Sequence, residues 1–245
     1  MADSTPEVVL RAQNLGFKRG ERWIFRKLDL ELRAGQFLAL VGPSGVGKST
    51  LLSCLCGFRQ PSEGSVSIHL PGESNTAPEA LRRHLGIVFQ DLQLTANADL
   101  LTNVLCGRLA RFSWLRTLFG FPPDQRSEAY ELLHELGVAR DPHKWVSQMS
   151  GGEQQRVAIA RALFQNPRLY FADEPVSSLD SYYAGRVLGL FRQETEQPKK
   201  AAVCVLHNAE HIQRFADLAL SLNPNDPAAY KIRQVRPAGP IAPIA

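Results

Sequence analysis

The chain has 245 residues, 44% of them hydrophobic, a formal net charge of +4 and four cysteines. It is long enough for one large domain or two small ones, and it has no run of about eighteen apolar residues that could cross a bilayer. The N-terminal sequence lacks the basic and apolar regions of a signal peptide, and the cysteines show neither metal-ligand nor disulfide spacing. No stripe of interleaved basic and aromatic residues indicates nucleic-acid binding. We therefore expect a reduced, cytosolic protein that does not bind nucleic acid.

The apolar pattern alternates between strand and helix spacing along the chain. Alternating apolar residues predict antiparallel strands over 8–10 and 26–32 and a strand over 65–70. Between 92 and 148, and again between 172 and 201, apolar residues recur at helical spacing, and the sequence FPPD at 121–124 breaks the first of these regions in two. Continuous short apolar runs predict buried strands over 37–41, 85–90, 169–172 and 201–206.

The run GPSGVGKST follows the strand predicted over 37–41 and fits the phosphate-binding pattern G-x-x-x-x-G-K-[ST]. Glycines let the backbone curl so that its N–H groups and the following helix N-terminus face an anion. Lys48 is expected to reach the β- and γ-phosphates, and the Ser49 hydroxyl to ligate Mg²⁺. A chance glycine-rich turn is the alternative. The residues expected to bind the nucleotide here are Gly42, Pro43, Ser44, Gly45, Val46, Gly47, Lys48, Ser49 and Thr50.

The apolar strand predicted over 169–172 ends in two carboxylates, Asp173 and Glu174. Asp173 is placed to hold Mg²⁺, and Glu174 to polarise an attacking water. A solvated turn is the alternative interpretation. The separation of about 125 residues from the phosphate-binding loop favours the roles in Mg²⁺ binding and water activation over a solvated turn.

A second anion-binding helix end is predicted where Ser150, Gly151 and Gly152 open the segment SGGEQQRVAIARA. Free N–H groups, a hydroxyl and the helix dipole all favour an anion there. Two such helix ends in one chain favour a dimer in which each ATP lies between opposite subunits. Alternatively, Ser150 is an N-cap and Glu153 completes a capping box. The two roles are compatible.

With these motifs the chain resembles the nucleotide-binding subunits of ABC (ATP-binding cassette) transporters over roughly residues 7–222. The resemblance implies an α/β P-loop fold with a parallel-sheet core, an antiparallel β-subdomain and a helical insert at about 92–150. It implies that Gln90 is the Q-loop glutamine, which senses Mg²⁺ and contacts the permease. The resemblance further implies that Ser178, Leu179 and Asp180 form the D-loop, which communicates across the dimer. It also implies that His207 is the switch histidine at the γ-phosphate. The implied catalytic residues are Glu174, His207 and Gln90, and the implied metal ligands are Ser49, Gln90 and Asp173.

The chain departs from the family pattern at three places. Met149 and Glu153 stand where the family commonly has leucine and glutamine. Near residue 19, where an aromatic residue should stack on adenine, the chain has Arg19. Three candidates for the adenine contact stay open: Phe17, Trp23 and the guanidinium plane of Arg19. The third departure is the C-terminal segment, whose five prolines in 23 residues predict a loose tail over 223–245 after a domain over 1–222.

The segment 103–120 and Val176 are similar to those of phosphonate-importer ATPases and of their relatives for phosphite and hypophosphite. Leu105, Leu109, Phe112 and Leu115 recur at helical spacing and predict an apolar stripe in this segment. Arg108, Arg111 and Arg116 are expected to lie away from it. They would then meet an acidic permease surface or lipid headgroups. A solvated basic face is the alternative.

The resemblance implies a homodimer of ATPase subunits that couples ATP hydrolysis, with Mg²⁺, to conformational change in integral membrane permease subunits. It implies an indirect partner, a periplasmic solute-binding protein, and a peripheral location on the cytoplasmic face of the inner membrane. Two alternatives are an ATPase of the lipoprotein-release or cell-division type and a soluble, non-transport ABC ATPase.

Overall fold

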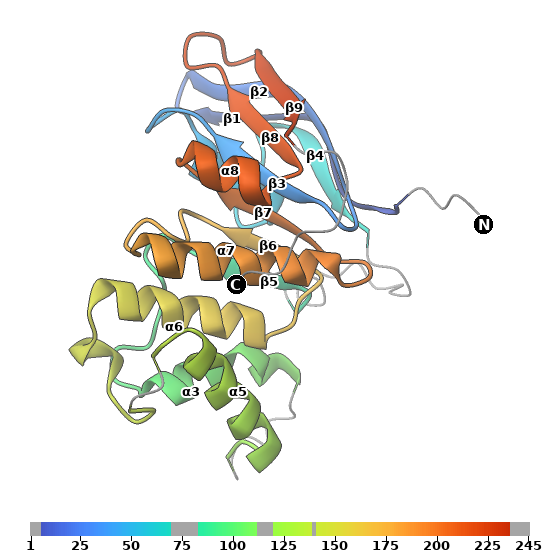
Figure 1. Cartoon of the computed structure of the whole chain (residues 1–245). Helices are drawn as coiled ribbons and strands as arrows, with labels where there is room; N and C mark the ends of the chain where they lie inside the picture. Colours follow the sequence, from blue (N-terminus) through green and yellow to red (C-terminus); the bar gives the residue numbers. More distant parts are fainter. Residues whose placement is uncertain (1–5, 70–82, 112–119, 139–140, 236–245) are drawn as a thin grey trace.

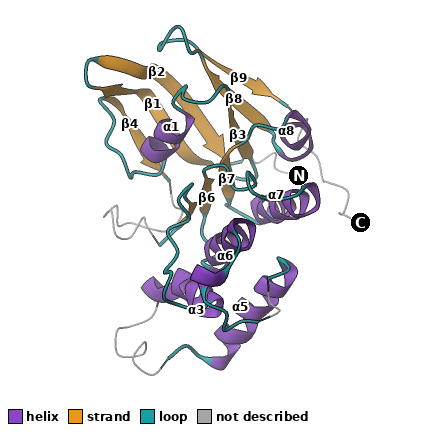
Figure 2. Ribbon diagram, turned by 90° about the vertical axis from the view of Figure 1, so that its left-hand side faces the viewer, coloured by secondary structure: helices purple, strands orange, loops and turns teal. Residues whose placement is uncertain are grey.

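The computed structural model describes residues 6–69, 83–111, 120–138 and 141–235, and Figure 1 shows their arrangement. A strand-rich part lies at the top of that view, and a group of helices lies at the bottom. Figure 2, turned by 90°, shows the same separation. None of the described helices has the length and apolar character needed to span a membrane.

The smaller sheet is antiparallel, with the strand order β2-β1-β4, and it contains the antiparallel strands predicted near the N-terminus. Its strands are β1 (Val8–Arg19), β2 (Arg22–Arg33) and β4 (Glu63–Ile68). The first two strands are longer than predicted because they form one hairpin around Gly20, which has a φ of 60°. A left-handed conformation of this kind suits a tight turn and strains glycine little.

The second sheet has six strands in the order β5-β6-β7-β3-β8-β9. The strands from β5 to β8 in this order pair in parallel, and β9 pairs antiparallel with β8. This arrangement confirms the predicted α/β fold, although the apolar pattern predicts neither β8 nor β9. The strands are β3 (Phe37–Val41), β5 (Leu85–Val88), β6 (Leu169–Ala172), β7 (Ala201–Val205), β8 (Leu218–Leu222) and β9 (Tyr230–Gln234).

Both faces of the parallel sheet are covered, which explains why its strands read as continuous apolar runs. Successive side chains of β3 alternate between two core clusters: Phe37 and Ala39 belong to one, and Leu38 and Leu40 to the other. Helices α6 (Gly151–Phe164) and α7 (Ser181–Glu196) bury residues in the first cluster. Helix α1 (Lys48–Leu55) and the antiparallel sheet bury residues in the second.

The predicted helical insert is present. Pro122 and Pro123 break the helical region, as predicted, and they also start a new helix, because α5 begins at Pro123. The first position of a helix tolerates proline. Leu109 is 41% exposed and does not continue a buried stripe; Phe112, Leu115 and Arg116 lie outside the described residues. The remaining helices are α3 (Leu100–Leu105), η1 (Cys106–Arg111), α5 (Pro123–Glu135), η2 (Val146–Gln148) and α8 (Ala209–Phe215).

The loose-tail prediction is wrong for residues 223–235, because these form the return of a β8–β9 hairpin. Strand β9 closes the edge of the parallel sheet, and the Tyr230 hydroxyl accepts a hydrogen bond from the Asp29 N–H at 3.1 Å. The turn between the strands is held by Asp226, whose side chain accepts from the Ala228 N–H at 2.9 Å. Residues 236–245 lie outside the described residues.

Candidate functional site

The phosphate-binding loop connects β3 to α1, as predicted. Gly42, Gly45 and Gly47 have φ values of 132°, 79° and 112°, which L side chains rarely adopt. A Cβ at Gly47 would also lie 2.4 Å from Cγ2 of Ile24 on β2. Glycine is therefore required at position 47 both for the backbone conformation and for the close packing of the loop against the antiparallel sheet.

Lys48 is buried at the start of α1. Its ammonium donates hydrogen bonds to the carbonyls of Gly42 and Pro43, both at 2.9 Å. Burial lowers the pKa of Lys48, and the carboxylates of Glu174 and Asp173 oppose this shift. A poorly solvated cation at the N-terminus of a helix is suited to an anionic ligand.

Ser49 and Asp173, 124 residues apart, are brought together with Ser49 Oγ 3.1 Å from Asp173 Oδ1. Burial raises the pKa of Asp173, which the hydrogen bond from Ser49 partly offsets. A hydroxyl beside a carboxylate is a set of hard oxygen donors, the kind Mg²⁺ takes beside phosphates. A cation would also relieve the desolvation of Asp173, so these two residues fit Mg²⁺.

Glu174 and His207 meet at the same edge of the sheet, with Glu174 Oε1 2.8 Å from His207 Nε2. The two residues follow neighbouring strands, because β6 pairs in parallel with β7. In open α/β sheets ligands bind at the carboxyl ends of the strands. A cavity of about 240 Å³ lies beside the pair, lined also by Asn208 and His211.

Gln90 is exposed two residues after the end of β5, the neighbour of β6. The segment that follows it is anchored to α6, because the Arg161 guanidinium donates to the carbonyls of Leu92 and Gln93, both at 2.7 Å. Gln90 therefore lies at the sheet edge that carries Asp173. Its roles at the metal and the permease remain predictions.

Ser150 is the N-cap of α6, and the capping box with Glu153 is present. The structural alternative for Ser150 is thus confirmed. Gly151 and Gly152 begin the helix, whose N-terminal N–H groups are the predicted anion donors. Hydrogen bonding from the Ser150 N–H lowers the pKa of Glu153, so this helix start carries an ionised carboxylate where the family commonly has an amide.

Asp180 is the N-cap of α7 and accepts a hydrogen bond from the Tyr183 N–H at 2.9 Å. Gln155, a neighbour of this loop that the motifs do not indicate, is buried in the structure. The Gln155 amide donates to the Glu174 carbonyl at 2.9 Å and accepts from the Ser178 N–H at 3.1 Å. No spacing in the sequence indicates these contacts, because they join segments about twenty residues apart.

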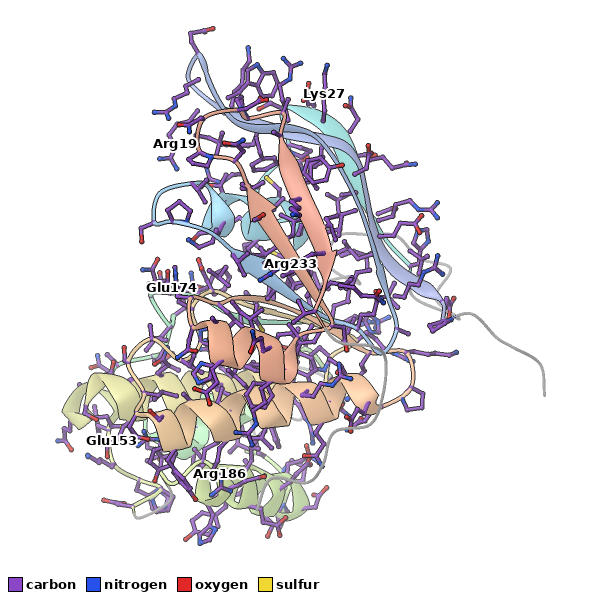
Figure 3. The ribbon with its side chains drawn as sticks, turned by 45° about the horizontal axis from the view of Figure 1, so that its top comes forward. Arg19, Lys27, Glu153, Glu174, Arg186 and Arg233 are labelled. Carbon is purple, nitrogen blue, oxygen red and sulfur yellow. The ribbon has the colours of Figure 1, made fainter. Side chains whose placement is uncertain are left out.

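The candidate adenine contacts lie on the β1–β2 hairpin. Cations already contact both aromatic rings: Lys18 and Arg26 lie 4.8 and 4.4 Å from the centre of the Trp23 ring, and Arg59 lies 5.1 Å from that of Phe17. Arg19 is exposed near the hairpin turn. Figure 3 shows Arg19, Glu174 and Glu153 along one side of the molecule.

The predicted outward position is wrong for Arg108, whereas Arg111 is exposed. Arg108 is buried, with its guanidinium 4.0 Å from the Phe164 ring centre and paired with Glu128. Arg111 donates to the carbonyls of Gln165 and Asn166. Both side chains join the helical insert to the end of α6, and the buried Arg108 is not available to a permease or a lipid surface.

A glycine-rich loop before a helix, with strand-end carboxylates and a histidine at the same edge of a parallel sheet, defines a P-loop nucleoside triphosphatase. A family model described as ABC transporter matches residues 25–177. The chain therefore belongs to the ABC transporter family and is one of its ATPase cassettes.

Two relatives and one solved structure illustrate the likeness. The phosphonates import ATP-binding protein PhnC 3 of Nostoc sp. is 40% identical over 80% of this chain and 76% of its own length. The phosphite import ATP-binding protein PxtA of Stutzerimonas stutzeri is 43% identical over 80% of this chain and 72% of its own length. A dimeric, post-hydrolysis structure of the ATP-binding cassette MJ0796, bound to ADP and Pi, is 28% identical with a TM-score of 0.79, covering 94% of this chain and 100% of that one.

Proposed function

We propose that this chain is the ATP-hydrolysing subunit of an importer for a small phosphorus oxyanion: a phosphonate, phosphite or hypophosphite. The ATPase part of the proposal is carried by the meeting of Ser49 with Asp173 and of Glu174 with His207 at one sheet edge. The solute class is supported by relatives named for phosphonates, phosphite and hypophosphite import, which are 34–43% identical to this chain.

In the proposed reaction, the loop N–H groups and Lys48 bind the β- and γ-phosphates of ATP. The Lys48 ammonium then gives up its hydrogen bonds to the Gly42 and Pro43 carbonyls and donates to the phosphates instead. Ser49 and Asp173, with Gln90, would hold Mg²⁺, which neutralises phosphate charge when bound. Glu174 accepts a hydrogen bond from the attacking water and polarises it, and His207 donates to the γ-phosphate.

The proposed assembly is a homodimer that closes over two ATP molecules. The phosphate-binding loop of one subunit would face Ser150, Gly151 and Gly152 of the partner subunit, with Asp180 near the same contact. The relative MJ0796 was solved as a dimer. Figure 3 shows Glu153, which belongs to the segment that Ser150 caps, on the same side of the molecule as Glu174. ATP would stabilise the closed state and hydrolysis would release it, which shifts the population between the two.

The proposed partners are integral membrane permease subunits, contacted through Gln90 and its loop, and through them a periplasmic solute-binding protein. The subunit would then lie peripherally on the cytoplasmic face of the inner membrane. Because the ATPase does not touch the solute, the permease and its receptor carry the solute specificity.

Titration calorimetry of the co-encoded receptor tests the solute class. The expected result is binding of phosphonate, phosphite or hypophosphite, with phosphate, sulfate, amino acids and metal ions as controls. A receptor that binds only an amino acid or a metal contradicts the solute class. The absence of any receptor from a complex that still hydrolyses ATP would favour a lipoprotein-release or cell-division role and leave the ATPase assignment intact.

A further inference from the structure

One buried side chain connects three motifs of the site. Gln155 lies in the second turn of α6, the helix that Ser150 caps, and is 4% exposed. Its Nε2 donates to the carbonyl of Glu174, and its Oε1 accepts from the N–H of Ser178. Both ends of the amide are therefore satisfied, one by the residue that carries the proposed catalytic carboxylate and the other by the D-loop.

The Glu174 carbonyl accepts hydrogen bonds both from its own turn and from α6. Glu174 has a φ of 52°, a conformation that costs a non-glycine residue energy and persists where the surroundings hold it. Ser177 donates to the Glu174 carbonyl from its N–H and its hydroxyl, at 3.3 and 3.1 Å, but Ser177 belongs to the same turn. At 2.9 Å, Gln155 links this carbonyl to a separate rigid element.

Helix α6 contacts the D-loop segment at two further points. A Cβ at Gly152 would lie 3.0 Å from the carbonyl oxygen of Ser178, so the start of the helix packs directly on this loop. One residue beyond Gln155, the Arg156 guanidinium lies 4.2 Å from the centre of the Tyr183 ring on α7. A displacement of α6 therefore moves the segment on both sides of Asp180.

We propose that Gln155 is a positioning residue that couples the two ATP sites of the dimer. It transmits the position of α6, whose N-terminus contacts the nucleotide bound mainly by the partner subunit, to the Glu174 carboxylate of its own subunit. This inference rests on the closed dimer proposed above. The residue type follows from the contacts: an amide supplies one donor and one acceptor, whereas a carboxylate of the same size accepts only.

The decisive variant is Gln155→Glu, which keeps the acceptor for Ser178 and replaces the donor with an oxygen facing the Glu174 carbonyl. The assembled transporter is assayed for ATP turnover over a range of ATP concentrations. Because small misplacement of a reacting group is costly, kcat is expected to fall by about 10–100-fold. The Hill coefficient for ATP should fall toward 1. ATP binding to the isolated subunit should stay unchanged, since Gln155 does not touch the phosphate-binding loop.

Gln213→Glu is the matched control, because it makes the same change of charge at an exposed position on α8. It should leave kcat, the Hill coefficient and the melting temperature unchanged. If Gln155→Glu lowers the melting temperature, Gln155→Met is measured in the same way, because it removes both hydrogen bonds without adding a charge. A normal kcat and Hill coefficient in a folded Gln155 variant overturn the inference, as does a loss of kcat that only parallels lost ATP binding.

Glu174→Gln, assayed in the same assembled transporter, distinguishes an error in the coupling role of Gln155 from an error in the proposed ATPase site. If Glu174→Gln abolishes turnover while Gln155→Glu leaves it intact, the coupling inference is wrong and the proposed ATPase site stands. If Glu174→Gln turns over normally, the assignment of the catalytic carboxylate is itself wrong.

Discussion

The Glu174 carboxylate lies 2.8 Å from Nε2 of His207, across two neighbouring parallel strands. The side chains are 26% and 44% exposed, so water reaches both. The carboxylate proposed to polarise water and the histidine proposed to contact the γ-phosphate are thus held together by the fold itself. This preorganisation limits how far either group must move during hydrolysis.

Glu174→Gln is expected to lower ATP turnover by about 10²–10⁴-fold while ATP still binds, because general-base assistance is lost and the phosphate contacts persist. The variant should accumulate an ATP-bound dimer, which size-exclusion chromatography with and without ATP detects. Lys48→Ala provides the contrast, since it should lose ATP binding itself. Turnover at the unmutated rate would contradict the role of Glu174.

Arg19→Ala is expected to weaken ATP binding by about 1–3 kcal/mol, the range for stacking on a base. Arg19 is exposed near the hairpin turn, whereas the rings of Trp23 and Phe17 already contact cations. Trp23→Ala and Phe17→Ala should therefore change the ATP dissociation constant less. Equilibrium binding of ATP to the isolated subunit measures the affinity of each variant. A larger loss of affinity for Trp23→Ala or Phe17→Ala would assign the adenine contact to that aromatic residue instead.

Glu153→Gln is expected to destabilise the subunit at neutral pH but not in acid. The Ser150 N–H donates to the Glu153 carboxylate and holds its pKa below the usual 4.5. A lowered folded-state pKa contributes stability above the unfolded pKa, and this contribution is lost as the pH falls through the folded value. The difference in melting temperature from the unmutated chain should therefore be present at pH 7 and shrink below about pH 4.5. A difference independent of pH would exclude this charge as its cause.

Arg108→Leu is expected to lower the free energy of unfolding by about 2–3 kcal/mol, because charge-assisted hydrogen bonds and a desolvated cation–π contact are lost. Arg108 donates to the Phe164 carbonyl at 2.5 Å and pairs with Glu128. Glu128 remains half-exposed, so its charge can still be solvated. Arg126→Leu, at an exposed position on α5, is the control. Equal urea-unfolding midpoints for the two variants would refute a structural role for Arg108.

The sequence by itself determined the phosphate-binding loop, the strand-end carboxylates and the parallel core. Each of these is encoded locally: glycines at the positions of positive φ, a helix that starts at Lys48, and short apolar runs that must be covered on both faces. The capping box at Ser150 is equally local, because its partners are three residues apart.

Only the tertiary structure decided which polar residues are structural and which are exposed. Arg108 looks like a surface charge in sequence, yet its carbonyl partner lies 56 residues away. Strand β9 follows proline-rich sequence and forms because the edge of β8 is free to pair with it. The hydrogen bonds of Gln155 with Glu174 and Ser178 are also known only from the tertiary structure. Hydrogen bonds between distant segments leave no periodic pattern in the sequence.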